Sequence, residues 1–508
     1  MGGVVASTMS VAISKDLALD YCRVPPFHPP VRYPEYPFPD LCPGNRVYGA
    51  VRQLLFRMGL DRKHFGQPDW NPLGVIVRPG DHVFVKPNLV GHRNPVGGIE
   101  SLIAQGSVVR AITDYAYIAL QGRGKLTIGD SPQLETDFGA VVRLTGLGQI
   151  VDYYGQQGMD VGLLNLMKVR GRTRKIGGVA FKKLEGDPLG YRTVDLKADS
   201  SHFGIIGDCE KFRVADYDSR EMIRHHNGDR NEYCVSASVL DADAVISVPK
   251  LKTHAKTGIS CALKNMIGIN GAKDWLPHHR MGPAEEGGDE YIRSDRRKDA
   301  FVRLKEAMVD SNNLFLIVPM RAASAALILS KLVVPFRDPC LQGSWYGNDT
   351  IPRTIADMNK ILFYADKEGV MRDAPQRRCF VLVDGIVAGE KEGPMTPEPK
   401  RCGLLVAGFD PVAIDAVCCE AMGFDYRKVP TIMHALHSGR YRLSHGGVEE
   451  TEVIADACDR FDQLYGAYDC ALEPPGTWKG HIEHAAVPEA RQTVLKPVPV
   501  LIAGGGKK

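Results

Sequence analysis

Five short apolar runs constrain the fold more than any other feature of this sequence. Each has the length of a strand, ends at a polar or proline-bearing turn and is followed by a helical pattern. Because the runs are apolar throughout rather than alternating, both faces of each strand should be covered. They predict an α/β fold with a mostly parallel sheet layered between helices, in one unit or in two α/β subdomains. The runs are His82–Asn88, Lys125–Pro132, Ala244–His254, Cys379–Ile386 and Gly403–Pro411.

Two helices are also predicted from the sequence. Ser107–Leu120 has apolar residues at helical spacing, and Asp410 followed by Pro411 is typical of a helix start, with Gly423 near the end of that helix. In sheets of this kind, ligands bind beyond the carboxyl ends of the strands, where helix N-termini and backbone donors converge. We therefore expect a ligand site where the apolar runs end.

The segment Val245–Arg280 concentrates positive charge after one of these runs. Between Lys250 and Arg280, six basic residues stand against one acid, Asp274, in a chain whose net charge is only +3. Glycines rather than acids separate the basic residues, which favours a pocket for an anion. Together with groups at the other strand ends, the predicted ligand-binding residues are Lys86, Asn88, Asp130, Ser131, Lys250, Lys252, Thr253, Asn265 and Asp384.

The carboxylates at the strand ends have a second interpretation. Asp130, Asp384 and Asp410 could equally serve as helix caps or turn residues. The glycines of Asp384–Pro397 would allow its backbone to surround a ligand. Neither a P-loop nor a G-x-G-x-x-G pattern follows any predicted strand, which disfavours the common nucleotide-binding folds.

Lys264 is the strongest candidate for chemistry. A helix is expected over Ile259–Ile269, with Ser260, Lys264 and Gly268 on one stripe. A lysine between small residues can pair with a carboxylate or phosphate or, when partly desolvated, act as a base or nucleophile. We predict Lys264 and His254 as catalytic residues, with His254 transferring the proton. The alternative for Lys264 is a surface position on an amphipathic helix.

Two adjacent histidines, His278 and His279, follow the same helix. They could hold a divalent transition metal, alone or as part of a metal-nucleotide cofactor. A structural role remains the alternative, because the block holds no pair of histidines four residues apart.

Composition narrows the partners and the compartment. With 508 residues, 44% hydrophobic and 24% charged, the chain is an ordinary globular protein of one large or several domains. Aromatic residues do not interleave with the basic ones, so nucleic acid is not expected. The twelve cysteines form no C-x-x-C motif, which argues against an iron–sulfur cluster and for reduced thiols in the cytoplasm. We expect a small anionic metabolite as partner and leave a homo-oligomer open.

No membrane span is predicted. The N-terminus lacks the basic and apolar regions of a secretory signal. The one long apolar stretch, 313–336, is interrupted by Pro319, Arg321 and Lys331. We expect it to form a buried strand and helix rather than a membrane or peripheral segment.

These patterns divide the chain into five segments. They are an extended Pro-rich arm (1–46), an α/β domain with the basic site (47–280), a charged loop or lid (281–312), a second α/β region that completes the core (313–470) and a C-terminal tail (471–508). Within the third segment, 281–299 fits a lid and a plain solvated loop equally.

Several motifs resemble those of the DUF362 family, a domain of unknown function some of whose members are described as iron–sulfur centre proteins. The motifs are VFVKPNLV, IGDSP, VISVPKLKTHAKTGISCALKNMIG, VDGIVAGEKEGP with TPEPK, and FDPVAIDAV with MGFD, between about Val83 and Pro430. Members that bind clusters usually carry an added ferredoxin segment, whose cysteine pattern this sequence lacks. The resemblance therefore implies a family and leaves its activity open.

A fainter resemblance is to the nickel-dependent lactate racemases, in the order of strand, His, Gly-bearing turn, Lys on a glycine-flanked helix, and later His. It implies that Lys264 anchors a metal-nucleotide, that His254 acts as acid or base, and that His278 or His279 is the metal ligand. The sequence differs from that family in its ALKNM segment and in having Asp130-Ser131 where a histidine is expected.

Three hypotheses follow. The first is an enzyme that acts on a small metabolite carrying a carboxylate or phosphate. The second is a non-catalytic protein that holds a cofactor or metabolite for a partner. The third is a racemase or epimerase that depends on a metal cofactor, which is the best single guess for a reaction class. Fold alone does not discriminate between them.

Overall fold

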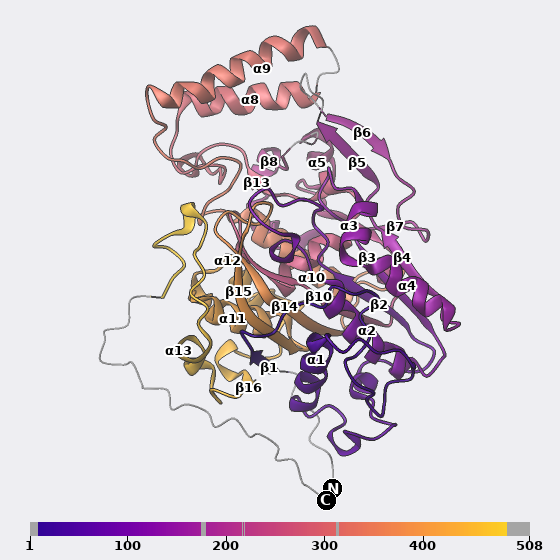
Figure 1. Ribbon diagram of the computed structural model, residues 1–508. Helices are drawn as coiled ribbons and strands as arrows, with labels where there is room; N and C mark the ends of the chain where they lie inside the picture. The colour runs from indigo at the N-terminus through magenta and orange to yellow at the C-terminus, as the bar shows by residue number, and fades with distance from the viewer. Residues whose placement is uncertain (1–8, 174–178, 216, 218, 311–313, 485–508) are drawn as a thin grey trace, which may run out of the picture.

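The computed structural model describes residues 9–173, 179–215, 217, 219–310 and 314–484. Within them, a ten-stranded sheet runs through the middle of the molecule, and helices cover both of its faces (Figure 1). The strand order is β16-β1-β15-β14-β10-β2-β3-β4, with β11 beside β14 and β12 beside β11. The strands are β1 Ser10–Lys15, β2 His82–Pro87, β3 Lys125–Asp130, β4 Val161–Asn165, β10 Ala244–Val248, β11 Lys250–His254, β12 Gly258–Ser260, β14 Arg378–Glu390, β15 Glu398–Gly408 and β16 Glu452–Ile454.

The centre of the sheet is parallel, as the apolar runs predict. Strands β14, β10, β2, β3 and β4 pair in parallel with one another in that order. Four of the five runs therefore form parallel strands at the predicted places. The run Ala244–His254 divides at Pro249 into β10 and β11, and β11 pairs with the far half of β14.

The prediction for the fifth run, Gly403–Pro411, is wrong in one respect. It forms the end of β15, which is antiparallel to both of its neighbours, β14 and β1. Its carboxyl end therefore lies at the opposite edge of the sheet from the other four. Asp410 accepts hydrogen bonds there from the backbone of Val412 and Ala413, at 2.9 and 3.0 Å, and caps the next helix.

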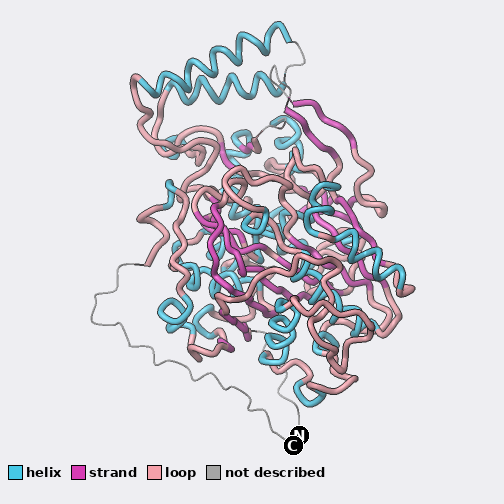
Figure 2. The backbone as a smooth tube through the Cα atoms, viewed as in Figure 1, coloured by secondary structure: helices cyan, strands magenta, loops and turns pink. Residues whose placement is uncertain are grey.

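Two helical layers enclose the sheet, as Figure 2 shows. One core lies between the sheet and α6, α7, α10, α11, α12 and α13, and the other between the sheet and α1, α2, α3 and α4. Neighbouring strand residues alternate between the cores, because successive side chains of a strand point to opposite faces. The helices are α1 Arg46–Arg57, α2 Gly106–Leu120, α3 Phe138–Thr145, α4 Leu147–Gln156, α5 Ser219–His225, α6 Ala237–Leu240, α7 Ala262–Asn265, α10 Thr350–Tyr364, α11 Pro411–Met422, α12 Pro430–Leu436 and α13 Leu464–Tyr468.

Three antiparallel strand pairs lie outside the main sheet. They are β5 Val169–Thr173 with β6 Val179–Lys183, β7 Tyr191–Asp195 with β9 Glu232–Ser236, and β8 Phe212–Arg213 with β13 His279–Arg280. These pairs and the loops between them rise on the side of the sheet where β2, β3 and β10 end (Figure 1).

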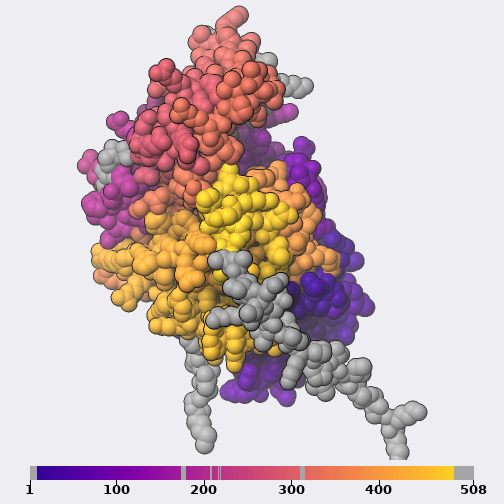
Figure 3. Space-filling model, turned by 90° about the vertical axis from the view of Figure 1, so that its left-hand side faces the viewer, coloured from indigo at the N-terminus to yellow at the C-terminus, as the bar shows by residue number. Residues whose placement is uncertain are grey.

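Both ends of the described chain pack against the core. The Pro-rich arm has no regular element between β1 and α1, and its aromatic side chains are buried against α2 and α4. At the other end, Trp478 and Ile482 are fully buried and contact the turn at Gly258. Residues 1–8 of the predicted arm and 485–508 of the predicted tail lie outside the described residues. Figure 3 shows the C-terminal segment, in yellow, lying across one side of the molecule.

Two long helices form a hairpin at one end of the molecule. They are α8 Arg296–Asp310, within the segment predicted as a charged loop, and α9 Leu314–Leu329. The prediction of a buried strand and helix for 313–336 is wrong for the described part, 314–336, because this segment is helical and most of its apolar side chains are exposed. Both faces of the sheet are already covered, so α9 packs against α8 rather than in the core. Within the described ranges, Phe315–Leu332 is the one helical stretch long and apolar enough to cross a membrane by length and composition.

Candidate functional site

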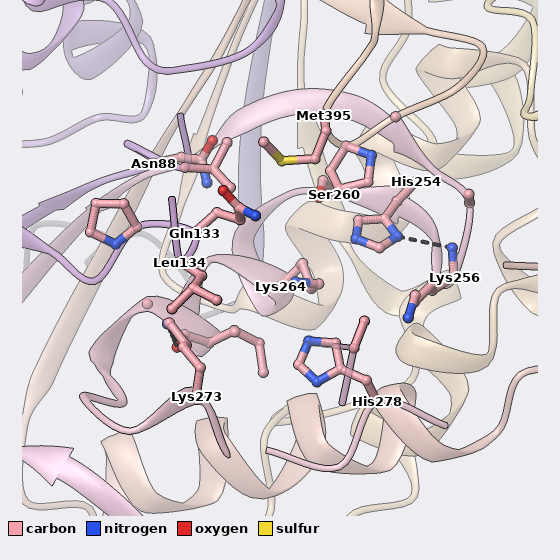
Figure 4. Close-up of a pocket in the computed structure, with 18 of the residues that line it drawn as sticks. Asn88, Gln133, Leu134, His254, Lys256, Ser260, Lys264, Lys273, His278 and Met395 are labelled. Atoms are coloured by element: carbon pink, nitrogen blue, oxygen red, sulfur yellow. Dashed lines mark hydrogen bonds between the residues drawn. The ribbon is translucent and has the colours of Figure 1, made fainter. Parts of the chain in front are cut away.

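A cavity of about 540 Å³ opens at the carboxyl ends of β2, β3 and β10, where the sequence predicts a ligand site. Strand β11, the helical turn α7 and the loop between β14 and β15 form its other walls (Figure 4). Nine of the predicted site residues line it: Asn88, Asp130, Ser131, Lys250, Lys252, His254, Lys264, Asn265 and His278.

A buried ion pair fixes the floor of the cavity. Nζ of Lys86 lies 2.7 Å from Oδ1 of Asp130 and donates to Oδ1 of Asn265 at 2.9 Å. A Cβ atom at Gly268 would lie 2.0 Å from the same Asp130 oxygen, so only glycine allows this approach. Asp130 also accepts from the backbone N–H of Leu89 at 2.7 Å. Lys86 is therefore neutralised beneath the cavity and does not line it.

A second buried pair holds Lys250. Its Nζ lies 3.1 Å from Oδ1 of Asp384 and donates to the hydroxyl of Tyr21 at 2.7 Å, which in turn donates to Asp384 at 2.6 Å. Burial lowers the pKa of Lys250, and Asp384 opposes this shift. Burial, reinforced by Asp384, raises the pKa of Tyr21. The predicted ligand residue Asp384 is thus a structural counter-charge outside the cavity.

Three other lysines line the cavity without a carboxylate partner in the described part of the chain. Lys252 donates to the carbonyl of Leu102 at 2.7 Å, and Lys273 donates to the carbonyl of Ile267 at 3.2 Å. For Lys264, no hydrogen bond or ion pair is found among the described residues. Figure 4 shows Lys264 in the middle of the cavity wall, which rules out a position on the outer surface.

Desolvation and mutual repulsion make these amino groups unusually acidic. Burial, followed by the charges of Lys256 and Lys86, lowers the pKa of Lys264 to about 8. Burial also lowers the pKa of Lys273 to about 7 and that of Lys252 well below its ordinary value. A cation held in a low-dielectric site without a counter-ion loses hydration that nothing replaces. The cavity is therefore prepared for a negative ligand.

Two histidines face the cavity in complementary states. Nδ1 of His254 accepts from the backbone N–H of Lys256 at 3.0 Å, whereas Nδ1 of His278 donates to the carbonyl of Leu276 at 2.7 Å. Burial and the surrounding lysines hold both pKa values well below 6.5, so both rings are neutral. The remaining Nε2 of His254 consequently carries a proton, and that of His278 carries a lone pair.

His279 points away from this cavity. It is buried near Glu290, with 3.7 Å between its Nε2 and a carboxylate oxygen. His278 directly precedes β13 and lines the cavity, whereas His279, the first residue of β13, does not. The two predicted metal ligands therefore do not share a site. Among the residues with described positions, no group of three or more His, Cys, Asp or Glu could hold a metal ion.

The predicted helix over Ile259–Ile269 is replaced by shorter pieces. Residues up to Ser260 form β12, α7 covers Ala262–Asn265, and a 3₁₀ turn covers Met266–Ile269. Ser260, Lys264 and Gly268 nevertheless all line the cavity, as their spacing predicts. Thr253 does not, because its hydroxyl donates to the carbonyl of Lys391 at 2.8 Å.

Several cavity residues were not predicted. Lys256 and Lys273 belong to the basic block, and Glu392 and Met395 belong to the Gly- and Pro-rich loop, so a signal existed for all four. Gln133 follows the second strand without any distinguishing pattern. The possible lid 281–299 contributes no residue to the cavity lining.

Comparisons with known proteins identify the region that carries most of this site. The profile of a domain of unknown function, DUF362, matches residues 193–420. A thylakoid-associated protein of Synechocystis sp. is 23% identical over 362 residues, which cover 71% of this chain and 68% of that protein. A crystal structure of a Thermotoga maritima protein aligns with this chain at 11% identity and a TM-score of 0.30, over 71% of this chain and 56% of the Thermotoga chain. The resemblance to lactate racemase stays a prediction.

Proposed function

We propose that this chain, whose residues 193–420 match the profile of the DUF362 family, binds a small carboxylate- or phosphate-bearing metabolite and acts on it as an enzyme. One observation carries the proposal. Three lysine amino groups without a carboxylate partner in the described chain, those of Lys252, Lys264 and Lys273, line a single cavity of about 540 Å³.

The energetics favour an anionic occupant. Each pKa unit by which a bound anion raises the pKa of Lys264 or Lys273 contributes about 1.4 kcal/mol to binding, roughly a tenfold gain in affinity. Charge-assisted hydrogen bonds from ammonium groups to carboxylate or phosphate oxygens are shorter and stronger than neutral ones. Asn88, Ser131 and Gln133 add neutral donors to the lining of the same cavity.

The reaction class that the site favours is proton transfer, as in a racemase or epimerase. The protonated Nε2 of His254 is a donor, and the unprotonated Nε2 of His278 is an acceptor, facing one cavity. Lys264, whose pKa is lowered to about 8, is mostly protonated at neutral pH, and a bound anion would raise that pKa, so Lys264 serves as the cation that holds the anion. A bound anion would raise the pKa of both imidazoles and so strengthen His278 as a base.

Binding is tested by calorimetric titration with inorganic phosphate and with lactate. We expect the Lys264→Met protein to bind at least one of these anions about tenfold more weakly or worse, the loss typical of a hydrogen bond to a charged group. The matched control is Lys63→Met, because Lys63 is exposed and does not line the cavity, and this variant should bind the anions normally. Wild-type affinity in Lys264→Met for every anion that the protein binds would refute the proposal.

Catalysis is tested separately, so that a non-catalytic binding protein can be recognised. In deuterated water, an enzyme that moves a proton at carbon incorporates deuterium into its bound hydroxy acid. We expect His254→Gln and His278→Gln to abolish this incorporation while anion binding persists. Binding without any exchange in the wild-type protein would favour the non-catalytic alternative.

A reducing, cytoplasmic location belongs to the same proposal. None of the twelve cysteines forms a disulfide, and the sulfurs of Cys22 and Cys42 lie 3.6 Å apart. Such a pair persists as thiols in a reducing compartment. The absence of nucleic acid among the partners stays a prediction.

A further inference from the structure

The hairpin of α8 and α9 protrudes from one end of the molecule (Figures 1 and 3). Helix α9 packs against α8 and the 3₁₀ turn Ser330–Leu332, with few contacts to the rest of the protein. Between Phe315 and Leu329, only Ile317 and Ser324 are buried, one stripe that faces α8. Met320, Leu327 and Ile328 are half-buried, and the other residues of this stretch are exposed.

This open surface is strongly apolar. Of the eighteen exposed large hydrophobic residues in the described chain, seven lie in the segment from Phe315 to Val334. Phe315 is 91% exposed, Leu332 77% and Val333 86%. Residues 315, 316 and 318 point in different directions around a helix, since each residue turns it by about 100°. The exposed apolar residues are therefore spread around α9, from Phe315 near its start to Val334 beyond its end, rather than forming one flat face, and a patch of this kind indicates an interaction site.

The charge of the segment identifies its partner. Between Leu314 and Arg337 there is no aspartate or glutamate, whereas Arg321, Lys331 and Arg337 are exposed. Apolar side chains interleaved with cations and free of acids complement a surface that is hydrophobic within and negative at its boundary, as an anionic lipid bilayer is. A helix that binds in the groove of a protein partner has one apolar face, which the groove covers, and one polar face, which stays in solvent. Helix α9 has no such polar face.

The geometry decides how the segment can meet a bilayer. Helix α9 and the 3₁₀ turn after it contain the stretch Phe315–Leu332, whose length would suffice for a crossing, so the anchoring of the hairpin is decisive. The chain enters α8 from Tyr291 and returns to Cys340 and Trp345, and these three residues share one small core with Val302. Both ends of the hairpin are thus anchored on the same side, so α9 could cross the bilayer only if α8 crossed with it. Helix α8 carries charged residues along its length, which a hydrocarbon core excludes.

We propose that α9 and the following turn to Val334 dock the protein on an anionic membrane surface from one side. Exposed Leu316, Val318, Leu329, Leu332 and Val333 enter the headgroup boundary, and the basic residues contact lipid phosphates. The proposal is independent of the anion site and of any reaction there.

Vesicle flotation of the full-length protein tests the proposal. We expect binding to vesicles of phosphatidylcholine with phosphatidylglycerol and much weaker binding to phosphatidylcholine alone. Leu329→Ser should weaken partitioning about tenfold, because burial of one such side chain contributes about 1.5 kcal/mol or more. Leu17→Ser is the matched control, since Leu17 is 60% exposed and Leu329 59%.

A second experiment tests the contribution of charge with a double variant, Lys331→Gln combined with Arg337→Gln. At low salt this double variant should bind anionic vesicles about 25-fold more weakly, at about 1 kcal/mol for each cation. All variants change exposed side chains, so folding is checked by circular dichroism and should be unchanged.

Two outcomes would overturn the proposal. One is failure of the wild-type protein to float with anionic vesicles. The other is a concentration-dependent dimer in analytical ultracentrifugation that Leu329→Ser dissociates, because the covered surface would then belong to a second copy of the chain.

Discussion

The affinity of the cavity for a fully ionised anion should fall steeply as the pH rises. Sulfate is a suitable probe, because its charge is constant between pH 6 and pH 9. The pKa of Lys273 is lowered to about 7 and that of Lys264 to about 8, so these two cations lose their protons in turn within this range. Burial and the neighbouring lysines lower the pKa of both histidines well below 6.5, so the two lysines dominate the change in this range.

The magnitude follows from the two values. The logarithm of the association constant should fall by about one per pH unit between pH 7 and 8, and by about two per unit above pH 8. At pH 9 about one hundredth of Lys273 and about one tenth of Lys264 remain protonated, so the affinity is up to about a thousandfold lower than at pH 6.

Calorimetric titration of sulfate at pH 6, 7, 8 and 9 measures this slope. In Lys273→Met the break near pH 7 should disappear, leaving a fall of about one per unit above pH 8. The reasoning would be refuted by a wild-type affinity that stays within about twofold over the whole range, or by a Lys273→Met profile with both breaks intact.

Three further predictions concern stability. The pKa of Lys264 is about 8 in the folded protein and 10.5 ordinarily, so the folded state binds fewer protons between these pH values and the free energy of unfolding rises with pH there. Without anions, the Lys264→Met protein should therefore have a higher melting temperature than wild type at pH 7, and the difference should shrink by pH 9.5. Gly268→Ala, whose Cβ would lie 2.0 Å from Asp130, should lose about 3 kcal/mol or more in urea denaturation, whereas Gly155→Ala, with nothing within 4 Å, should not. Asp384→Asn should cost about 3 kcal/mol at pH 7 and less at pH 9, because burial lowers the pKa of Lys250 and the loss of Asp384 lowers it further, which eases release of the unpaired proton; an equal loss at both pH values would contradict this.

Local patterns in the sequence predict much of the fold correctly. Strands β2 and β3 begin at the predicted residues, and α11 has the expected acidic cap, first-turn proline and glycine stop. These features depend on neighbouring residues, so they can be recognised without the tertiary structure. The basic block likewise predicts a cavity lined by lysines, because its charge density cannot be dispersed over a surface without acids.

Contacts between residues far apart in the sequence could not be predicted from such local patterns. The pairing of Lys250 with Asp384 and Tyr21 joins residues 134 and 229 positions away, and no local signal distinguishes these carboxylate and hydroxyl groups from helix caps or surface residues. For the same reason Asp384 and Lys86 were predicted to bind ligand, although each has a protein partner. Which lysines keep an unpaired charge is a property of the folded neighbourhood alone.

By itself, the sequence determined that the chain forms a layered α/β sheet and that cations gather at the ends of its strands, because periodicity and charge density are local properties. The tertiary structure decided the antiparallel course of β15, the division of the lysines into neutralised and unpaired groups, and the exposure of α9. These depend on which surfaces are already occupied when each segment packs. An apolar helix is buried only where a vacant face of the core remains, and both faces of this sheet are taken.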